Sequence, residues 1–258
     1  MRGNRPKGIV ITPRDREFLG ALAECRLADR EMFQAITGVR LVSRANGLLA
    51  RLHAARLLKR YYLGTPAGGQ KALYELTSKG AAVIGQAKSW TFQHAENELL
   101  VGDAFVEHQL AVNWCWISAK YRSTPGIEFL RWLRFQEAVS STVALIPDGY
   151  GEWRKDGATT AVFLEVDLGT ESGSVWEKKI ALYLKLASSG EFERTFCQPR
   201  FKVAVVATSE RRLETLRKLI SKHTHKIFYF NVLNNIKQGG MNSSLWLRPV
   251  GEERMPLL

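Results

Sequence analysis

Three acidic side chains in the second half of the chain have a spacing that suits a divalent cation. Asp148 stands in the run IPDGY, where we expect it at the end of a strand, and Glu165 and Asp167 are two residues apart in FLEVDLGTES. Side chains at positions i and i+2 of a strand point to the same face, and a hairpin would bring Asp148 beside them. Carboxylate oxygens are the ligands that Mg²⁺ prefers. The three residues are therefore candidate metal ligands and catalytic residues, because a bound metal would lower the pKa of an attacking water.

A lysine on the following segment could serve the same centre. Lys179 and Tyr183 are four residues apart in a predicted helix over 174–187, so they share a face, and the apolar residues beside them turn that face toward the sheet. Lys179 could then take a catalytic role beside the acids. One alternative is that it neutralises Glu165 or Asp167 in a structural ion pair. The carboxylates could also form a fold-stabilising or surface cluster, or a degenerate site that binds nucleic acid or metal without cutting.

A second group of side chains with a chemical use lies on a short helix that we expect Ser43 to cap. Its alanine and leucines recur with helical spacing and form one apolar face. The opposite face carries Arg44, Asn46, Arg51 and His53. Arg and Asn match the hydrogen-bonding edges of guanine and adenine in the major groove of DNA, and Arg40, just before the helix, could bind a phosphate. This pattern predicts a recognition helix.

The runs LLKRYYL and KALYEL follow this helix and are joined by the glycine-rich GTPAGGQ, which predicts a β-hairpin. The hairpin carries four polar or basic side chains that could bind DNA phosphates without reading the base sequence: Lys59, Arg60, Gln70 and Lys71. No acidic residue occurs between Arg40 and Lys71. The alternatives are that these are solvated charges on amphipathic elements, or that the same fold docks another protein.

Turn and cap signals place the recognition helix within a small N-terminal domain. Thr12 and Pro13 start a helix that should run to about residue 27, and Asp29 can cap a second helix that ends at Gly38. After the third helix and the hairpin, Thr77 can cap a fourth helix. Three helices with a tight glycine turn before the third, followed by a hairpin, predict a winged helix-turn-helix domain over residues 1–88.

The rest of the chain has a different pattern. A helical period covers about 94–120, and helices are also expected at 174–187 and 209–222. The expected strands are IEFLRWL, TVALI, AVFLEVDL, KVAVVAT and KIFYFNV. This predicts an α/β domain over 89–235, followed by a loose C-terminal segment over 236–258. The fold class is α+β, a winged helix-turn-helix followed by an α/β domain.

Composition favours an anionic partner. The chain has 258 residues, with 37 Lys and Arg against 25 Asp and Glu, a net charge of +12 that suits nucleic acid. No apolar run approaches the roughly 20 residues of a membrane-spanning helix, and the start lacks a secretory apolar region, so we expect a cytoplasmic protein. Cys25, Cys115 and Cys197 lack metal-ligand spacing and are expected to be buried free thiols.

The order of the motifs resembles two known families. The helix, strands, helix and strand around Asp148, Glu165 and Asp167 resemble the PD-(D/E)xK nuclease core, although Asp167 stands where that family has its lysine. Over about residues 10–220 the chain looks like the replication-relaxation family of plasmid and mobile-element proteins. That resemblance rests on TPRDREFLGAL, the RLHAARLLKRYYL to LYELTSKG hairpin, HQLAVN, IPDGY, and FLEVDLGTES followed by KIALY.

These observations lead to one main functional hypothesis and one rival. The main hypothesis is a sequence-specific double-stranded DNA-binding regulator or accessory factor of a plasmid or mobile element, acting as a homodimer without a cofactor, with an inactive nuclease-like second domain. A relaxase or replication initiator is a candidate protein partner. The rival is a Mg²⁺-dependent DNA endonuclease or nickase that the winged helix delivers to its site.

Overall fold

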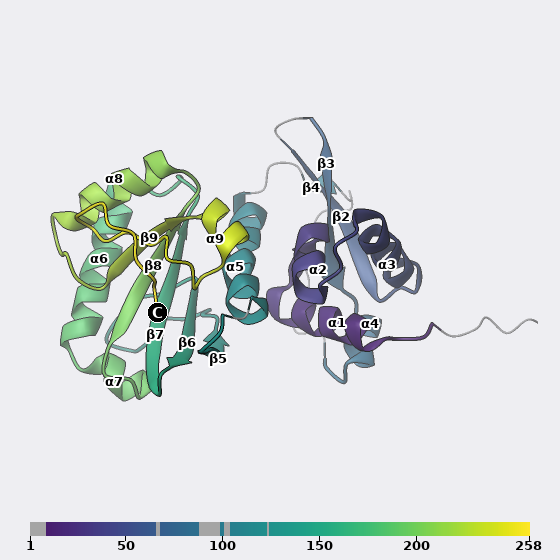
Figure 1. The fold of residues 1–258 in the computed structure, drawn as a ribbon, viewed down its shortest axis with the longest axis horizontal. Coiled ribbons are helices and arrows are strands. Elements are labelled where there is room, and N and C mark those ends of the chain that lie inside the picture. Colours follow the sequence, from purple (N-terminus) through teal and green to yellow (C-terminus); the bar gives the residue numbers. More distant parts are fainter. Residues whose placement is uncertain (1–8, 66–67, 88–98, 101–103, 123) are drawn as a thin grey trace, which may run out of the picture. The chain divides into compact units, whose positions relative to one another are not determined.

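The computed structural model describes residues 9–65, 68–87, 99–100, 104–122 and 124–258. The chain divides into two compact units, unit 1 over Met1–Asn113 and unit 2 over Trp114–Leu258. The boundary lies within helix α5 (Ala104–Tyr121), not near residue 88 as the change of sequence pattern suggested. Helices and sheets occur in both units, so the protein is of mixed α and β class (Figure 1).

Unit 1 begins with helices whose ends are set by capping residues. Helix α1 (Pro13–Cys25) starts with a capping box in which Thr12 and Asp15 satisfy each other's backbone N–H groups. Asp29 caps α2 (Arg30–Thr37), which ends at Gly38 in the left-handed conformation that glycine adopts without strain. These caps were predicted from the sequence. The cap of α3 (Val42–Ala54) was not, because Leu41 occupies the N-cap position and Ser43 lies inside the first turn.

The hairpin of unit 1 forms where the sequence predicts it. Strand β2 (Leu58–Gly64) pairs antiparallel with β3 (Gln70–Leu76), and β3 pairs on its other side with β1 (Leu27–Asp29). The sheet order is β1-β3-β2-β4, with β4 at Leu99–Leu100. Thr77 caps the short α4 (Ser78–Val83) as predicted. Leu99, assigned above to a helical period, is therefore in a strand, and residues 94–98 of that period lie outside the described residues.

The motif HQLAVN has a structural role in unit 1. Asn113, at its end, is fully buried, and its side-chain amide donates hydrogen bonds of 2.8 Å each to the carbonyl oxygens of Cys25 and Leu27. Between them, Arg26 has a positive φ of 68°, so the chain turns sharply from α1 into β1 at this point. Asn113 thus supplies hydrogen-bond donors to two carbonyls on either side of the turn.

Unit 2 contains a five-stranded sheet in the order β5-β6-β7-β8-β9. The first three strands are antiparallel and the last three are parallel. Their bounds are β5 Ile127–Leu133, β6 Gly149–Lys155, β7 Ala158–Asp167, β8 Phe201–Ala207 and β9 Phe228–Val232. The parallel pairs are joined by crossover helices, as parallel pairing requires.

Helices cover one face of this sheet and enclose the core. They are α6 (Gly173–Ser188), α7 (Glu191–Phe196) and α8 (Glu210–Ser221) (Figure 1). Alternate residues of the strands, such as Phe163 and Val203, pack with Trp176 and Ile180 of α6 in one buried cluster. The period-2 alternation of the strands sends the intervening side chains to the other face.

In unit 2 one predicted strand is absent and one observed strand was not predicted, each for an identifiable reason. TVALI is not a strand, because its backbone bonds locally: Val139 N–H donates to Leu145 O and Leu145 N–H to Val143 O, each at 2.8 Å. The strand next in sequence is β6, GYGEWRK, whose glycines disfavour a strand prediction. A Cβ on Gly149 would lie 2.5 Å from the Trp132 ring, so the glycine makes room for the indole. Asp148 consequently lies just before a strand and not at the end of one.

The C-terminal segment is packed, not loose. Helix α9 (Leu233–Gly239) follows β9 directly, and Leu247 pairs with Phe230 at the edge of that strand. Trp246 and Leu257 are fully buried. Cys25 and Cys115 are buried free thiols as predicted, whereas Cys197 is an exposed one. Within the described residues, no helix is long and apolar enough to cross a membrane.

Candidate functional site

The three predicted carboxylates do come together at the end of β7. Glu165 and Asp167 both contact helices on the same face of the sheet, as their spacing predicted. Asp148, just before β6, accepts a hydrogen bond from the backbone N–H of Val166 at 2.7 Å. Glu165 and Asp167 are buried and Asp148 is half-buried. The contacts of each carboxylate decide what the cluster can do.

Glu165 is held between two side chains of α6. The Tyr183 hydroxyl donates to its Oε1 at 2.6 Å, and the Lys179 ammonium donates to its Oε2 at 2.9 Å. Burial raises the pKa of Glu165 to about 7, although Lys179 acts in the opposite direction. The two residues that the helical spacing placed on one inward face therefore both contact this one carboxylate.

Lys179 is shared between two carboxylates. Besides Glu165 it donates to both oxygens of Glu171, at 2.7 and 2.9 Å. Burial lowers the pKa of Lys179, but the two carboxylates more than offset this, so its pKa lies above the ordinary value. A lysine held charged in this way has the geometry of the structural ion pair considered above, and not that of a free cation beside an open metal site.

Asp167 has its oxygens occupied by a second cation. Arg212, in the first turn of α8, donates to Oδ1 through Nε at 2.7 Å and to Oδ2 through a terminal nitrogen at 2.8 Å. The Trp176 indole donates to Oδ2 and the Gly169 N–H to Oδ1, each at 2.6 Å. Burial acts to raise the pKa of Asp167, but these hydrogen bonds hold it below its usual range.

Arg212 and Glu171 were not identified from the sequence. Arg212 is 45 residues from its partner Asp167, and one more arginine among 37 basic residues carries no distinguishing signal. One clue exists, because Ser209 is a good helix cap directly after a strand, and α8 therefore begins at the same sheet edge where β7 ends. Glu171 has no comparable clue.

The contacts of Glu165 and Asp167 differ from those expected for the metal site that was predicted for Asp148, Glu165 and Asp167. The cations Lys179 and Arg212 form ion pairs with Glu165 and Asp167, so they occupy the carboxylate oxygens that a metal ion would have to bind. Over the described part of the chain, no group of three or more His, Cys, Asp or Glu side chains could hold a metal ion. The cluster instead forms a buried network of compensated charges that ties β7 to α6 and α8.

The raised pKa of Glu165 predicts a pH-dependent stability. Its ordinary pKa of 4.5 applies when the protein is unfolded, so between pH 4.5 and about 7 the folded protein binds more protons at this residue. The stability that this group contributes is full below pH 4.5 and is lost as the pH rises toward 7. We expect the unfolding free energy of the wild type to decrease over this range by up to roughly 3 kcal/mol relative to Glu165→Gln. Urea unfolding at several pH values measures this, and parallel pH profiles of the two proteins would contradict it.

Helix α3 presents the face that the sequence assigned to DNA. Ala45, Leu49 and Leu52 are buried in unit 1. Arg40, Ser43, Arg44 and Asn46 are exposed. Leu41 and Val42, at the start of the helix, are 67% and 48% exposed, so apolar groups also lie on this surface. The helix thus has one buried apolar face and one exposed face with mixed chemistry.

Two of the residues predicted to contact DNA form ion pairs within unit 1 instead. Arg51 is one-third exposed and donates to buried Asp15 of α1 at 2.5 Å and to the Val10 carbonyl at 2.9 Å. Lys71 forms an ion pair with buried Asp29, the residue that caps α2. Both cations therefore compensate buried carboxylates. This structural role differs from the groove and phosphate contacts predicted for them.

The other hairpin residues lie near or on the surface. Lys59 and Gln70 are exposed, and Arg60 and His53 are half-buried. The Lys59 ammonium lies 4.8 Å from the ring centre of Tyr61, and the Arg60 guanidinium 5.2 Å from that of Tyr62. Such cation–π contacts hold long side chains in place on a strand without neutralising their charge.

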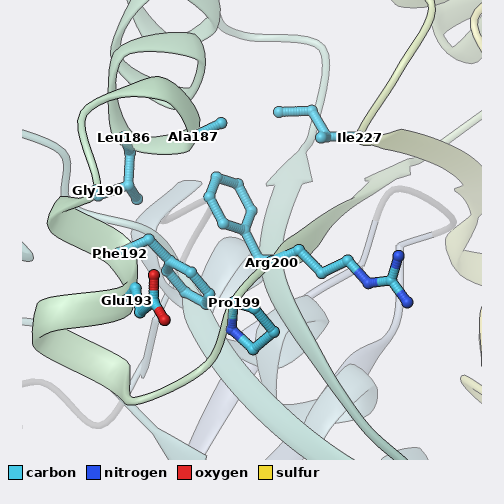
Figure 2. Close-up of a pocket in the computed structure, with 9 residues that line it drawn as sticks. Leu186, Ala187, Gly190, Phe192, Glu193, Pro199, Arg200 and Ile227 are labelled. Atoms are coloured by element: carbon cyan, nitrogen blue, oxygen red, sulfur yellow. The ribbon is translucent and has the colours of Figure 1, made fainter.

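A small cavity occurs elsewhere in unit 2. It has a volume of about 280 Å³ and lies between the end of α6, α7 and the start of β8 (Figure 2). Apolar side chains such as Leu186, Phe192 and Pro199 line most of it, and Glu193 and Arg200 are its charged members. In Figure 2 the Arg200 guanidinium and the Glu193 carboxylate point to opposite sides of Pro199.

The fold defines a protein of mixed α and β class, with an exposed basic helix in unit 1 and a buried charge network in unit 2. Residues 19–198 match the replication-relaxation family. The match covers more than half of the chain, so the protein belongs to this family, as its motifs suggested.

Two further comparisons add little. No curated protein matches the chain. Among solved structures, the restriction endonuclease FokI aligns with 88% of this chain at 11% sequence identity and a TM-score of 0.31. The alignment covers 43% of FokI, so the chain spans less than half of that enzyme.

Proposed function

We propose that this protein is a sequence-specific double-stranded DNA-binding regulator or accessory factor of a plasmid or mobile element. Membership of the replication-relaxation family supports a role connected with replication. The observation that carries the proposal is the exposed outer face of α3, with Arg44 and Asn46, in a stretch from Arg40 to Lys71 that has no acidic residue. A cationic helix face without acids attracts the DNA backbone and can approach base edges.

The element order of unit 1 supports a winged helix-turn-helix. Helices α1, α2 and α3 are followed by the β2–β3 hairpin, and β1 joins the hairpin as a third strand. In this assignment α3 lies in the major groove and the hairpin is the wing. Arg44 and Asn46 contact base edges, and Leu41 and Val42 are positioned for apolar contact with thymine methyl groups.

The remaining polar residues divide into two roles. In this proposal Arg40, Lys59, Arg60 and Gln70 bind phosphates, because Arg40 precedes α3 and the other three lie on the hairpin that would form the wing. Arg51 and Lys71 position the helix and the hairpin through Asp15 and Asp29. Ser43 and His53 border the same face, where Ser43 is exposed and His53 half-buried.

Unit 2 is proposed to be a nuclease-like domain that does not cut DNA. Its antiparallel strands, crossover helix and parallel strand follow the order of the PD-(D/E)xK core that the motifs resemble. The internal ion pairs of Glu165 and Asp167 support the loss of catalysis, because the carboxylates are committed to Lys179 and Arg212. The domain would then act as a scaffold, with a relaxase or replication initiator as a candidate partner.

Selection of binding sites from a pool of random duplex DNA tests the proposal. The purified full chain should enrich one sequence motif, with two related half-sites if the protein binds as a homodimer. A supercoiled plasmid carrying that motif should remain intact with Mg²⁺ or Mn²⁺ present. Failure to enrich any motif would contradict sequence-specific binding. Metal-dependent nicking that Glu165→Ala abolishes would instead favour the endonuclease.

A further inference from the structure

Four cationic side chains gather at one end of β8 in unit 2, far in sequence from the helix proposed to read DNA. They come from the end of β6, the residue before β8, β8 itself and the C-terminal segment: Lys155, Arg200, Lys202 and Arg248. We call this group the Lys202 cluster. Its members converge although 93 residues separate the first from the last, so only the fold brings them together.

An aromatic ring holds the centre of the Lys202 cluster in place. The Lys202 ammonium lies 5.1 Å from the ring centre of Tyr229, and the Arg248 guanidinium lies 4.4 Å from the same point. Arg248 also donates to the His225 carbonyl at 2.7 Å, Lys155 donates to a main-chain oxygen of Leu258, the last residue of the sequence, at 3.3 Å, and Lys202 donates to the Leu257 carbonyl. The ring and the carbonyls orient the cations.

No described Asp or Glu side chain forms an ion pair with any member of the Lys202 cluster. Glu193, the acid in the cavity beside Arg200, points away from that guanidinium (Figure 2). Burial and the three neighbouring cations lower the pKa of Lys202, as expected when positive charges lie close to one another. Elsewhere in unit 2, Lys179 and Arg212 do have carboxylate partners. Unlike those two cations, the members of the Lys202 cluster have no Asp or Glu side chain among the described residues to balance their charge.

We propose that the Lys202 cluster binds phosphate groups of the nucleic-acid backbone and gives unit 2 its own DNA contact. Preassembled cations that have no Asp or Glu partner among the described residues suit a polyanion, because neutralising phosphates releases counterions from the DNA. Arg200 and Lys155 are exposed and can approach a backbone, while half-buried Lys202 and Arg248 supply the fixed charge behind them. The choice of DNA as the polyanion rests on the proposed function. The contact itself is independent of base sequence.

Fluorescence anisotropy with a labelled duplex of arbitrary sequence tests this inference on the full chain. Lys155→Gln/Arg200→Gln should weaken binding about threefold to tenfold and reduce the slope of log affinity against log salt by about 1 to 2. The matched control is Lys178→Gln/Arg211→Gln, which removes the same charge from exposed positions on α6 and α8, across the sheet. We expect it to lower affinity less and to leave the salt slope unchanged.

Separate outcomes distinguish this inference from the proposed function. If both double variants lose affinity equally, the Lys202 cluster is not a phosphate site. If the cluster variant loses binding to vesicles of anionic phospholipid and keeps its DNA affinity, the cluster binds lipid headgroups and the inference is wrong. Arg44→Ala should leave binding to arbitrary DNA nearly unchanged, so failure of the recognition helix appears only on a selected motif. Thermal unfolding confirms that the cluster variant is folded, and removing like charges should leave its Tm equal or higher.

Discussion

Replacing Arg212 with methionine should lower the unfolding free energy of the protein by about 3–5 kcal/mol near neutral pH. Asp167 is buried, and Arg212 supplies two of its four hydrogen bonds and its only cationic partner among the described residues. Without the guanidinium, a carboxylate remains charged in a place where water cannot solvate it. Breaking one side of such a pair costs more than the pair contributes in net stability.

Urea unfolding followed by tryptophan fluorescence measures this loss, because Trp176 lies in the same network. Arg211→Met is the matched control, since Arg211 precedes Arg212 on α8 and is exposed. The double variant Asp167→Asn/Arg212→Met should recover part of the stability, because the buried charge is then gone. Equal stability of Arg212→Met and Arg211→Met would show that the ion pair does not support the fold.

Replacing Arg44 with alanine should weaken binding to the selected DNA motif by ~1–3 kcal/mol, or roughly 5- to 150-fold. Arg44 is exposed in the first turn of α3, and the interactions that the structure describes give it no buried carboxylate to compensate, unlike Arg51. An arginine fork that matches a guanine edge contributes specificity, so the loss should be confined to one or two positions of the motif.

Two controls accompany the Arg44 measurement. Arg14→Ala removes the same charge from an exposed position on α1 and should change affinity only slightly. Arg51→Ala should lower the Tm, because Asp15 loses the guanidinium that helps hold its pKa below the usual range against the effect of burial. If Arg44→Ala binds the motif as tightly as the wild type, α3 is not the recognition helix.

Local signals in the sequence were sufficient for most elements of unit 1. Thr12, Asp29, Gly38 and Thr77 set helix ends through hydrogen bonds to residues three or four positions away, so the pattern is visible without the fold. The hairpin was equally clear. In unit 2 the same approach mistook TVALI for a strand and overlooked β6, because a glycine that accommodates Trp132 is indistinguishable in sequence from one in a turn.

The sequence by itself determined the main helices and the hairpin of unit 1, most strands of unit 2, the shared face of Glu165 and Asp167, and the family. Only the tertiary structure decided which charges compensate one another. Arg51 pairs with Asp15, Lys71 with Asp29 and Arg212 with Asp167 across 36, 42 and 45 residues of chain. No local periodicity specifies such pairs, because a cation on an exposed face and one beside a buried acid can occupy the same helical position. Burial creates the need for a partner, and burial is a property of the folded chain.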